Sequence, residues 1–400
     1  MSTPHLRAWW SSRQGLSGSR EFASPADALE AAGWVRTVGG ANPYLALQAR
    51  GGFTRETVDA ALAAGEIHEL PSARGCTYLI PRSEYALALT VSQGFAESAA
   101  IATAKKYLGV TDSELDTLMT SVVDALGAGP LDPRELRTAL GDTVRNLGAE
   151  GKKRGQTTTL PLALGRLQSF GEIRRIPTDG RLDQERYRYA RWDSSPLSGI
   201  RLDRDAAFVQ LARRFFDWIG PAAPAHFQWF SGLGVVATKK TLAELDLVPI
   251  EPESPLLIQQ ADLDAFRNFR PEEGPEYAFI GSMDGLIHLR RDLTATIDPE
   301  DRDRPVLGEK TITCAGGLSD LPSHGIFDRG RLVGLWEFDP DAAQIEWHSF
   351  TDPDPAFNSC LERARAFVAR DLGDARSFSL DSPAGRRPRL SALRQLRTGN

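Results

Sequence analysis

The sequence predicts an α+β protein with tandem winged-helix domains, followed by a small β-barrel-like domain and a C-terminal helix. Two patterns lead to this prediction. Helical segments recur in groups within the first 250 residues, and glycine and proline separate them. From Val248 onward, short apolar runs alternate with Gly, Asp and Pro clusters, which is typical of strands joined by turns. A length of 400 residues also indicates several domains.

The first expected unit covers residues 1–108 and is winged-helix-like. Ser24 followed by Pro25 is typical of a helix start, because serine caps free N–H groups and proline suits the first helical position. This helix ends before Gly33, and Thr54 caps a second one. The other expected elements are strands over 34–38 and 76–80 and helices over 55–64 and 84–107.

The second expected unit, residues 109–200, has the clearest pattern. Asp132 with Pro133 caps a helix. Three helices followed by a hairpin form the winged-helix pattern, in which the third helix enters the major groove and the hairpin reaches phosphates or the minor groove. The expected elements are helices over 111–126, 133–140 and 160–169 and strands over 173–176 and 187–192.

A third winged-helix-like helical unit is expected over 201–250, and a β-rich domain with a closing helix over 251–375. Asp328-Arg329-Gly330 predicts a hairpin turn in the β-rich part. Residues 376–400 are arginine-rich and are expected to be a mobile tail, either a disordered end or an arm on the DNA backbone. The expected elements are helices over 205–219, 222–229, 238–246 and 355–371 and strands over 256–258, 277–280, 286–289, 331–338 and 344–350.

Composition excludes several classes of protein. Hydrophobic residues make up 41% of the chain, and no apolar run approaches the roughly 18 residues of a membrane span. The segment from Met1 to Leu16 lacks the apolar core of a signal peptide, so a cytoplasmic protein is expected. Cys76, Cys314 and Cys360 are too few and too scattered for a disulfide framework or a four-ligand zinc site, and we expect three buried, reduced thiols.

The net charge of −6 conceals an uneven distribution. Residues 151–191 carry ten Lys and Arg against four Asp and Glu, whereas residues 241–303 carry five basic and fifteen acidic residues. Residues 382–400 contain five arginines and no acid. Because phosphate binding depends on the local potential, a nucleic-acid partner is compatible with an acidic protein. A solvated basic face is the alternative.

Six short segments carry a resemblance to a known family. They are RQGL (13–16), PYLAL with AR (43–50), ARGCTYLIP (73–81), GPLD (129–132), WFSGL (229–233) and GRLVGLW (330–336). In this order they resemble the winged-helix proteins of the AlkZ type, which include bacterial alkylpurine and crosslink-repair DNA glycosylases. The resemblance covers nearly the whole chain. It implies tandem winged helices and a β-domain that form a concave basic surface around duplex DNA.

The glycosylases of this family carry a Gln-x-Gln or Gln-x-Asp motif on a short early strand, and this sequence departs from it. One candidate match is Gln48-Ala49-Arg50, where Gln48 and Arg50 would share a face of a strand. Alignment of residues 44–47 with the family's equivalent stretch places the motif instead at Arg36-Thr37-Val38. In both alignments the second functional position is neither Gln nor Asp.

The departure from this motif matters because of the charge that develops during N-glycosidic cleavage. Cleavage of an N-glycosidic bond builds positive charge on the sugar, and a water must be held against it. Arginine opposes that charge and cannot act as a base, so Arg36 is interpreted as a DNA-backbone contact. The candidate catalytic residues are Glu69, which could orient a water, His68, which could titrate near neutrality, and Gln48. Alternatively, neither residue is catalytic: Glu69 would be a carboxylate at the surface or in a turn, and His68 would be a polar residue whose hydrogen bonds are made within the protein.

The residues expected to contact DNA come from all the expected units. Thr158 would cap the third helix of the second unit against a phosphate, and Lys239 and Lys240 would begin the reading helix of the third unit. More phosphate than base contacts would give affinity with little sequence preference. The full set is Arg36, Arg74, Lys152, Lys153, Arg154, Thr158, Arg166, Arg174, Arg175, Lys239, Lys240 and Arg331.

The leading interpretation is therefore a duplex DNA-binding protein that resembles AlkZ-type glycosylases. The altered motif leaves open whether it excises alkylated or crosslinked bases by N-glycosidic hydrolysis. The alternatives are a winged-helix transcriptional regulator and a non-catalytic binder of DNA lesions. We expect double-stranded DNA as the partner, a monomer, no membrane, no cofactor and no metal, and a location at the nucleoid.

Overall fold

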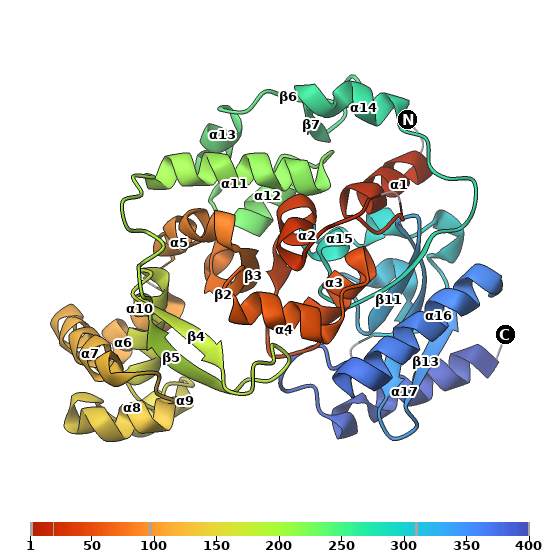
Figure 1. Ribbon diagram of the computed structural model, residues 1–400. Helices are drawn as coiled ribbons and strands as arrows, with labels where there is room; N and C mark the ends of the chain where they lie inside the picture. Colours follow the sequence, from red (N-terminus) through yellow and green to blue (C-terminus); the bar gives the residue numbers. More distant parts are fainter. Residues whose placement is uncertain (1–2, 19, 96–97, 309–310, 399–400) are drawn as a thin grey trace.

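The computed structural model describes residues 3–18, 20–95, 98–308 and 311–398 (Figure 1). The first unit, α2 to β3, is a set of helices beside a three-stranded antiparallel sheet in the order β1-β3-β2. The Ser24 side chain accepts a hydrogen bond from the Asp27 N–H, which confirms the expected cap. The elements are α1 (Thr3–Arg13), α2 (Pro25–Ala32), β1 (Val35–Arg36), α3 (Asn42–Gly51), α4 (Arg55–Ala63), β2 (Ile67–Pro71) and β3 (Thr77–Pro81).

Two expectations for this part of the chain are wrong. The segment that contains Gln48 and Arg50 is helix α3, so these side chains do not share a strand face. Pro43 occupies the first turn of α3 and Gly52 ends it in the left-handed conformation, with a φ of 65°. The helix expected over 84–107 is two helices, α5 (Tyr85–Gln93) and α6 (Ala99–Leu108), because α5 ends at Gly94.

The second unit, α7 to β5, has a core of its own (Figure 1). Leu118 and Val122 pack against Leu136, Ala163 and Leu164 in this core. The expected cap is present as a capping box between Asp132 and Glu135. The elements are α7 (Asp112–Ala125), α8 (Pro133–Leu140), α9 (Gly148–Lys153), α10 (Leu160–Ser169), β4 (Ile173–Pro177) and β5 (Tyr187–Arg191).

The third unit, α11 to β7, also ends in an antiparallel pair of strands. Helix α13 spans residues 235–242, earlier in the chain than expected, so Lys239 and Lys240 lie in its last turn instead of at its beginning. The shift arises because Gly234 starts the helix directly after the turn at Gly232. The elements are α11 (Arg204–Ile219), α12 (Pro224–Ser231), α13 (Val235–Leu242), β6 (Leu247–Pro249) and β7 (Leu257–Gln259).

The C-terminal region, β8 to α17, contains a four-stranded antiparallel sheet in the order β13-β12-β11-β8. Helix α16 packs against β8 and β13, and α17 packs against β12 and β13. The principal elements are α14 (Leu263–Asn268), β8 (Tyr277–Ile280), α15 (Gly285–His288), β9 (Pro305–Leu307), β10 (Ile312–Cys314), β11 (His324–Asp328), β12 (Arg331–Asp339), β13 (Gln344–Ser349), α16 (Pro355–Phe367) and α17 (Pro383–Thr398).

This region departs from the sequence-based expectations in three ways. In the described ranges the four strands pair in an open order with β13 and β8 at the edges, instead of a barrel. Residues 286–289, expected as a strand, belong to helix α15 and the residue after it, because the Asp284 side chain caps that helix. Residues 383–398, expected as a mobile tail, form α17, whose Arg386 is fully buried and paired with Asp374 at 2.7 Å.

Two further observations concern the burial of the cysteines and the character of the helices. Cys360 is buried, Cys76 is half-buried and Cys314 is exposed, so the expectation of three buried thiols fails at two positions. Within the described residues, no helix combines the length and the apolar character that crossing a membrane requires.

Candidate functional site

The three-stranded sheet of the first unit presents different polar side chains on its two faces. Arg36 pairs across the strands with Tyr78, and Tyr78 pairs with Leu70. Residues paired in this way share a face, whereas neighbours along a strand point to opposite faces. Glu69 precedes Leu70, so Glu69 and Arg36 lie on opposite faces of the sheet. Glu69, a predicted catalytic residue, and Arg36, a predicted DNA contact, therefore belong to two different sites.

On the first face, arginines and aromatic rings gather from distant parts of the chain. The Arg36 guanidinium lies 5.5 Å from the Tyr78 ring and donates a hydrogen bond to the Thr77 carbonyl at 3.1 Å. The Arg74 guanidinium lies 4.1 Å from the centre of the Trp229 ring. We call this set the arginine–aromatic cluster; it comprises Arg36, Arg74, Tyr78, Trp229, His288 and Arg291.

Three parts of the fold contribute to the cluster. Arg74 lies in the turn between β2 and β3, and Trp229 lies on α12 of the third unit. His288 ends α15 and meets the edge of Trp229 with ring centres 5.3 Å apart, and the Arg291 guanidinium lies 5.5 Å from the same indole. The first unit, the third unit and the C-terminal region thus meet at one place (Figure 1).

The backbone makes this close approach possible. Arg74 and Arg291 both have positive φ, 58° and 51°, which residues other than glycine adopt infrequently. A Cβ at Gly232, the residue that ends α12, would lie 3.0 Å from Cγ of Arg74 and 3.1 Å from Cζ of Phe95. Gly232 also has a φ of 76°, so a larger residue would separate Arg74 from the third unit.

His288 is half-buried and is neutral at physiological pH. Burial, and after it the positive charges of Arg36 and Arg74, lower its pKa to about 4, while Asp320 opposes the shift. Asp320 is itself paired with Arg291 at 2.8 Å. The cluster therefore combines fixed positive charge with an uncharged imidazole.

A buried ion pair attaches α15, and with it His288, to the first unit. Arg50 on α3 donates to both carboxylate oxygens of Asp284, at 2.7 and 2.9 Å, and Asp284 is fully buried. The same carboxylate accepts the backbone N–H of Leu286, so it also caps α15. Gln14 accepts a further hydrogen bond from Arg50 at 2.9 Å. This network fixes the position of α15 relative to α3.

On the second face, Glu69 lies against the β4–β5 hairpin. His68, its neighbour on β2, points to the first face and lies beside Trp192, the residue after β5. Glu69 is only 2% exposed; burial raises its pKa, whereas Arg175 lowers it. The Tyr187 hydroxyl donates to Glu69 at 3.5 Å. His68 is buried against Trp192, and burial lowers its pKa to about 3. Glu69 is therefore not a surface carboxylate, and both side chains are enclosed.

The predicted DNA contacts of the second unit differ from one another in exposure and in their ion pairs. Lys152 is exposed, whereas Lys153 and Arg154 both lie near Glu150, at 2.7 and 3.8 Å. Arg166 is 9% exposed and is bonded to Asp112 at 2.9 Å. Helix α10 packs against α5 and β2, so its arginine is not presented at the surface.

Thr158 is buried and does not cap α10: the cap position belongs to Thr159, without a side-chain hydrogen bond. Arg174 stacks on Trp192 at 5.1 Å and Arg175 on Tyr187 at 4.5 Å. Arg174 therefore lies near His68, and Arg175 lies near Glu69.

The remaining predicted contacts lie apart from the cluster. Lys239 is exposed, and Lys240 is paired with Asp205 at 2.5 Å. Arg331 faces three carboxylates that, by their spacing, could also hold a metal ion: Asp298, Glu300 and Asp301. Among the described residues Arg7 is also bonded to Asp298, so arginines already neutralise this acidic group.

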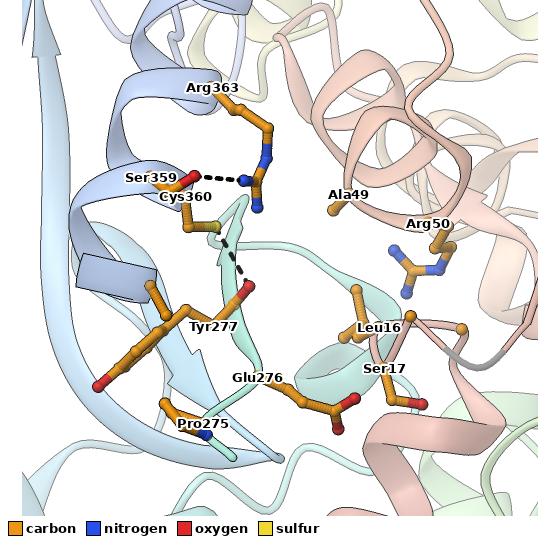
Figure 2. Close-up of a pocket in the computed structure, with 13 residues that line it drawn as sticks. Leu16, Ser17, Ala49, Arg50, Pro275, Glu276, Tyr277, Ser359, Cys360 and Arg363 are labelled. Carbon is orange, nitrogen blue, oxygen red and sulfur yellow. Dashed lines mark hydrogen bonds between the residues drawn. The ribbon is translucent and has the colours of Figure 1, made fainter. Parts of the chain in front are cut away.

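A pocket of about 390 Å³ lies between α3, β8 and α16, and Figure 2 shows its lining. The Cys360 thiol donates to the Tyr277 carbonyl at 3.2 Å, and Arg363 donates to the Ser359 hydroxyl at 2.9 Å. Arg50 borders the pocket but is bonded to Asp284. Cys360, Arg363 and Arg50 are therefore engaged with partners in this chain, and no residue that lines the pocket belongs to the arginine–aromatic cluster.

The sequence analysis missed Tyr78, Trp229 and His288. Tyr78 lies in the segment CTYLIP and Trp229 in the segment WFSGL, and both segments carried the family resemblance. Their membership in these segments could have identified them as candidate site residues. His288 gave no signal, because its segment was expected as a strand and its neighbours come from other units.

Comparison with known proteins agrees with this architecture. The model of the "DNA glycosylase AlkZ-like" family matches residues 29–376. This chain belongs to the AlkZ-like DNA glycosylase family. The solved structure of the Streptomyces sahachiroi DNA glycosylase AlkZ is similar, with a TM-score of 0.70 and 20% identity over 94% of this chain and 98% of that one. At that identity the likeness shows the shared fold alone. No curated protein matches the chain.

Proposed function

We propose that this AlkZ-like chain binds duplex DNA at the arginine–aromatic cluster and hydrolyses the N-glycosidic bond of alkylated purines. The observation that carries the proposal is the convergence of Arg36, Arg74 and Arg291 from two parts of the fold beside Trp229 of a third. Guanidinium groups suit phosphates, because they present fixed donors in a planar fork. Family membership supports the glycosylase chemistry.

The units α2–β3, α7–β5 and α11–β7 are proposed to be winged-helix domains. Each has helices followed by an antiparallel strand pair, and in the second and third units an isolated bridge adds the first strand of the pattern, Leu131 to Tyr189 and Ala222 to Leu257. In the second unit, α10 is packed against the first unit, so this unit would contact DNA through exposed residues such as Lys152.

The cluster is a narrower set than the sequence-based list. Arg166, Lys240 and Arg331 are engaged with carboxylates of this chain, and a phosphate would have to displace those partners. Arg36 and Arg74 instead contact aromatic rings and a carbonyl, and in the described part of the chain no carboxylate pairs with either of them. We therefore assign the main phosphate contacts to Arg36 and Arg74.

The second candidate function is a lesion binder without catalytic activity. Arg36 favours it, because β1 is the short early strand of the first unit and a guanidinium there opposes the cationic sugar of the hydrolytic transition state. The two candidates share the DNA contacts and differ only in base release.

Fluorescence anisotropy with a labelled duplex at low salt tests the binding. Arg74→Ala is expected to weaken binding about tenfold, the effect of losing one charge-assisted phosphate contact. Arg365→Ala on α16, which removes a charge already paired with Glu362 at 2.5 Å and lies outside the predicted DNA contacts, is the matched control and should bind like the unaltered protein. Absence of salt-sensitive binding by the unaltered protein would refute the proposal. Release of 7-methylguanine from a methylated duplex distinguishes the enzyme from the non-catalytic binder.

A further inference from the structure

We infer that His288 holds the hydrolytic water of this site; the inference rests on the proposed glycosidic hydrolysis. Helix α15 places this side chain beside Trp229 at the centre of the arginine–aromatic cluster. The role needs a group that accepts a hydrogen bond from water, is accessible and is held in position.

Among the cluster residues, His288 and Tyr78 can accept a hydrogen bond from water while uncharged; Tyr78 is only 3% exposed, whereas His288 is half-buried. Arginines only donate, and the Trp229 indole only donates. Val38, at the second position of the motif, is apolar. A neutral imidazole offers one acceptor nitrogen and one donor nitrogen, as an amide offers an oxygen and an NH₂ group. His288 can therefore take the place of the amide that the family's motif supplies from the strand.

The position of His288 is fixed from two sides. Its backbone N–H donates to the Asp284 carbonyl at 2.8 Å, and the Asp284 side chain is held by Arg50 on α3. Asn42, at the start of α3, donates to the carbonyl of Arg36 at 2.9 Å and to that of Met283 at 3.4 Å. These bonds connect β1 directly to the segment that carries His288. Arg50 and Asn42 are positioning residues in this arrangement.

The charges around His288 keep it uncharged. Arg36, Arg74 and Arg291 all disfavour the imidazolium form, and Asp320, which favours it, is paired with Arg291. His288 therefore has an acceptor nitrogen available across the neutral pH range.

The step balances as follows for an N7-alkylated purine, whose base carries a positive charge. The bond between C1′ and N9 breaks, and its electron pair stays on N9, so the base leaves neutral. The oxygen of the water held by His288 forms a bond to C1′. The product oxygen then carries an extra proton and a positive charge, and it loses that proton to the surrounding water; His288 orients the attacking water and is unchanged at the end.

The experiment measures DNA binding and base release separately in the full-length chain. His288→Ala should lower the single-turnover release of 7-methylguanine by about 100-fold, the order of effect expected when a reacting water is no longer held in position. Its affinity for the same duplex should stay within about threefold, because a neutral side chain makes no phosphate ion pair. His288→Gln should recover release to within about tenfold of the unaltered protein, since the amide restores the acceptor.

His5→Ala is the matched control, because His5 is half-buried on α1 against Phe266 and lies outside the cluster. Unchanged release by His288→Ala overturns the inference. Loss of release that Gln does not rescue also overturns it, because a structural role would give that result. If the unaltered protein binds duplex DNA without releasing base, the inference falls and the binding proposal stands. If it does not bind DNA, both fall.

Discussion

Removal of the Arg50 side chain provides a sharp test of how the first unit and the C-terminal region are joined. Arg50 is 3% exposed at its side chain and Asp284 is 0% exposed, and they share two hydrogen bonds of 2.7 and 2.9 Å. Arg50→Ala leaves the Asp284 charge buried without its partner. Removing one member of a buried pair typically costs about 3–5 kcal/mol, a large share of the roughly 5–15 kcal/mol stability of a folded domain.

Urea unfolding followed by tryptophan fluorescence measures this loss, because Trp10, Trp34 and Trp218 are all buried. With a slope of about 3 kcal/mol per molar urea, the midpoint should fall by about 1 M or more. Lys153→Ala removes the exposed pair with Glu150 and should shift the midpoint by less than about 0.3 M. A change of less than 1 kcal/mol in Arg50→Ala would refute the reasoning that this pair anchors α15.

Three further predictions concern other parts of the chain. Arg386→Ala should destabilise the protein by about 3 kcal/mol in the same urea assay, because it leaves Asp374 without its partner, whereas the exposed Arg387→Ala should be neutral within about 0.5 kcal/mol. Burial raises the pKa of Glu337 to about 7 in the folded protein, above the ordinary value of about 4.5. Between these two pH values the folded state holds a proton that the unfolded state has lost, so the contribution of this carboxyl to stability falls as the pH rises through that window. Unfolding midpoints at pH 5 and pH 8 should therefore differ less in Glu337→Gln than in the unaltered protein, and an equal difference contradicts the assignment. With the duplex saturated by protein, Arg36→Gln should speed single-turnover release of 7-methylguanine on the order of tenfold, because a positive charge that opposes the cationic sugar is removed, and slower release would contradict it.

Much of the helical framework could be predicted from local signals. Ser24 and Asp132 are caps followed by proline, and both helices begin where these residues predict. Such starts depend on a few neighbouring residues, so sequence alone determines them. The tandem grouping of helices and strand pairs also follows from glycine and proline positions.

The failures come from contacts between distant segments. The segment at 286–289 has apolar residues that suit a strand, yet Asp284 and Arg50, far apart in the chain, stabilise it as a helix. The arginines of 386–397 have the composition of a mobile end, yet Asp374 and Glu337 pair with Arg386 and Arg389 and hold the segment on the sheet. No local rule identifies partners that lie so far away.

The candidate site could be predicted in part for the same reason. Arg36 and Arg74 were identified from the chemistry of phosphate binding, and they lie in one cluster. The cluster depends on the approach of Trp229 and His288 from other units, which the sequence does not reveal. Glu69 had the appropriate chemistry for a catalyst but lies on the other face of the sheet, enclosed beside Arg175.

Amide hydrogen–deuterium exchange with and without duplex DNA tests the central claim most directly. If the arginine–aromatic cluster is the main DNA contact, exchange should slow most in residues 73–78, 227–232 and 286–291, with a smaller change in 147–154. Protection confined to 147–154, or no protection in the three cluster segments at a DNA concentration that saturates binding, would contradict the account.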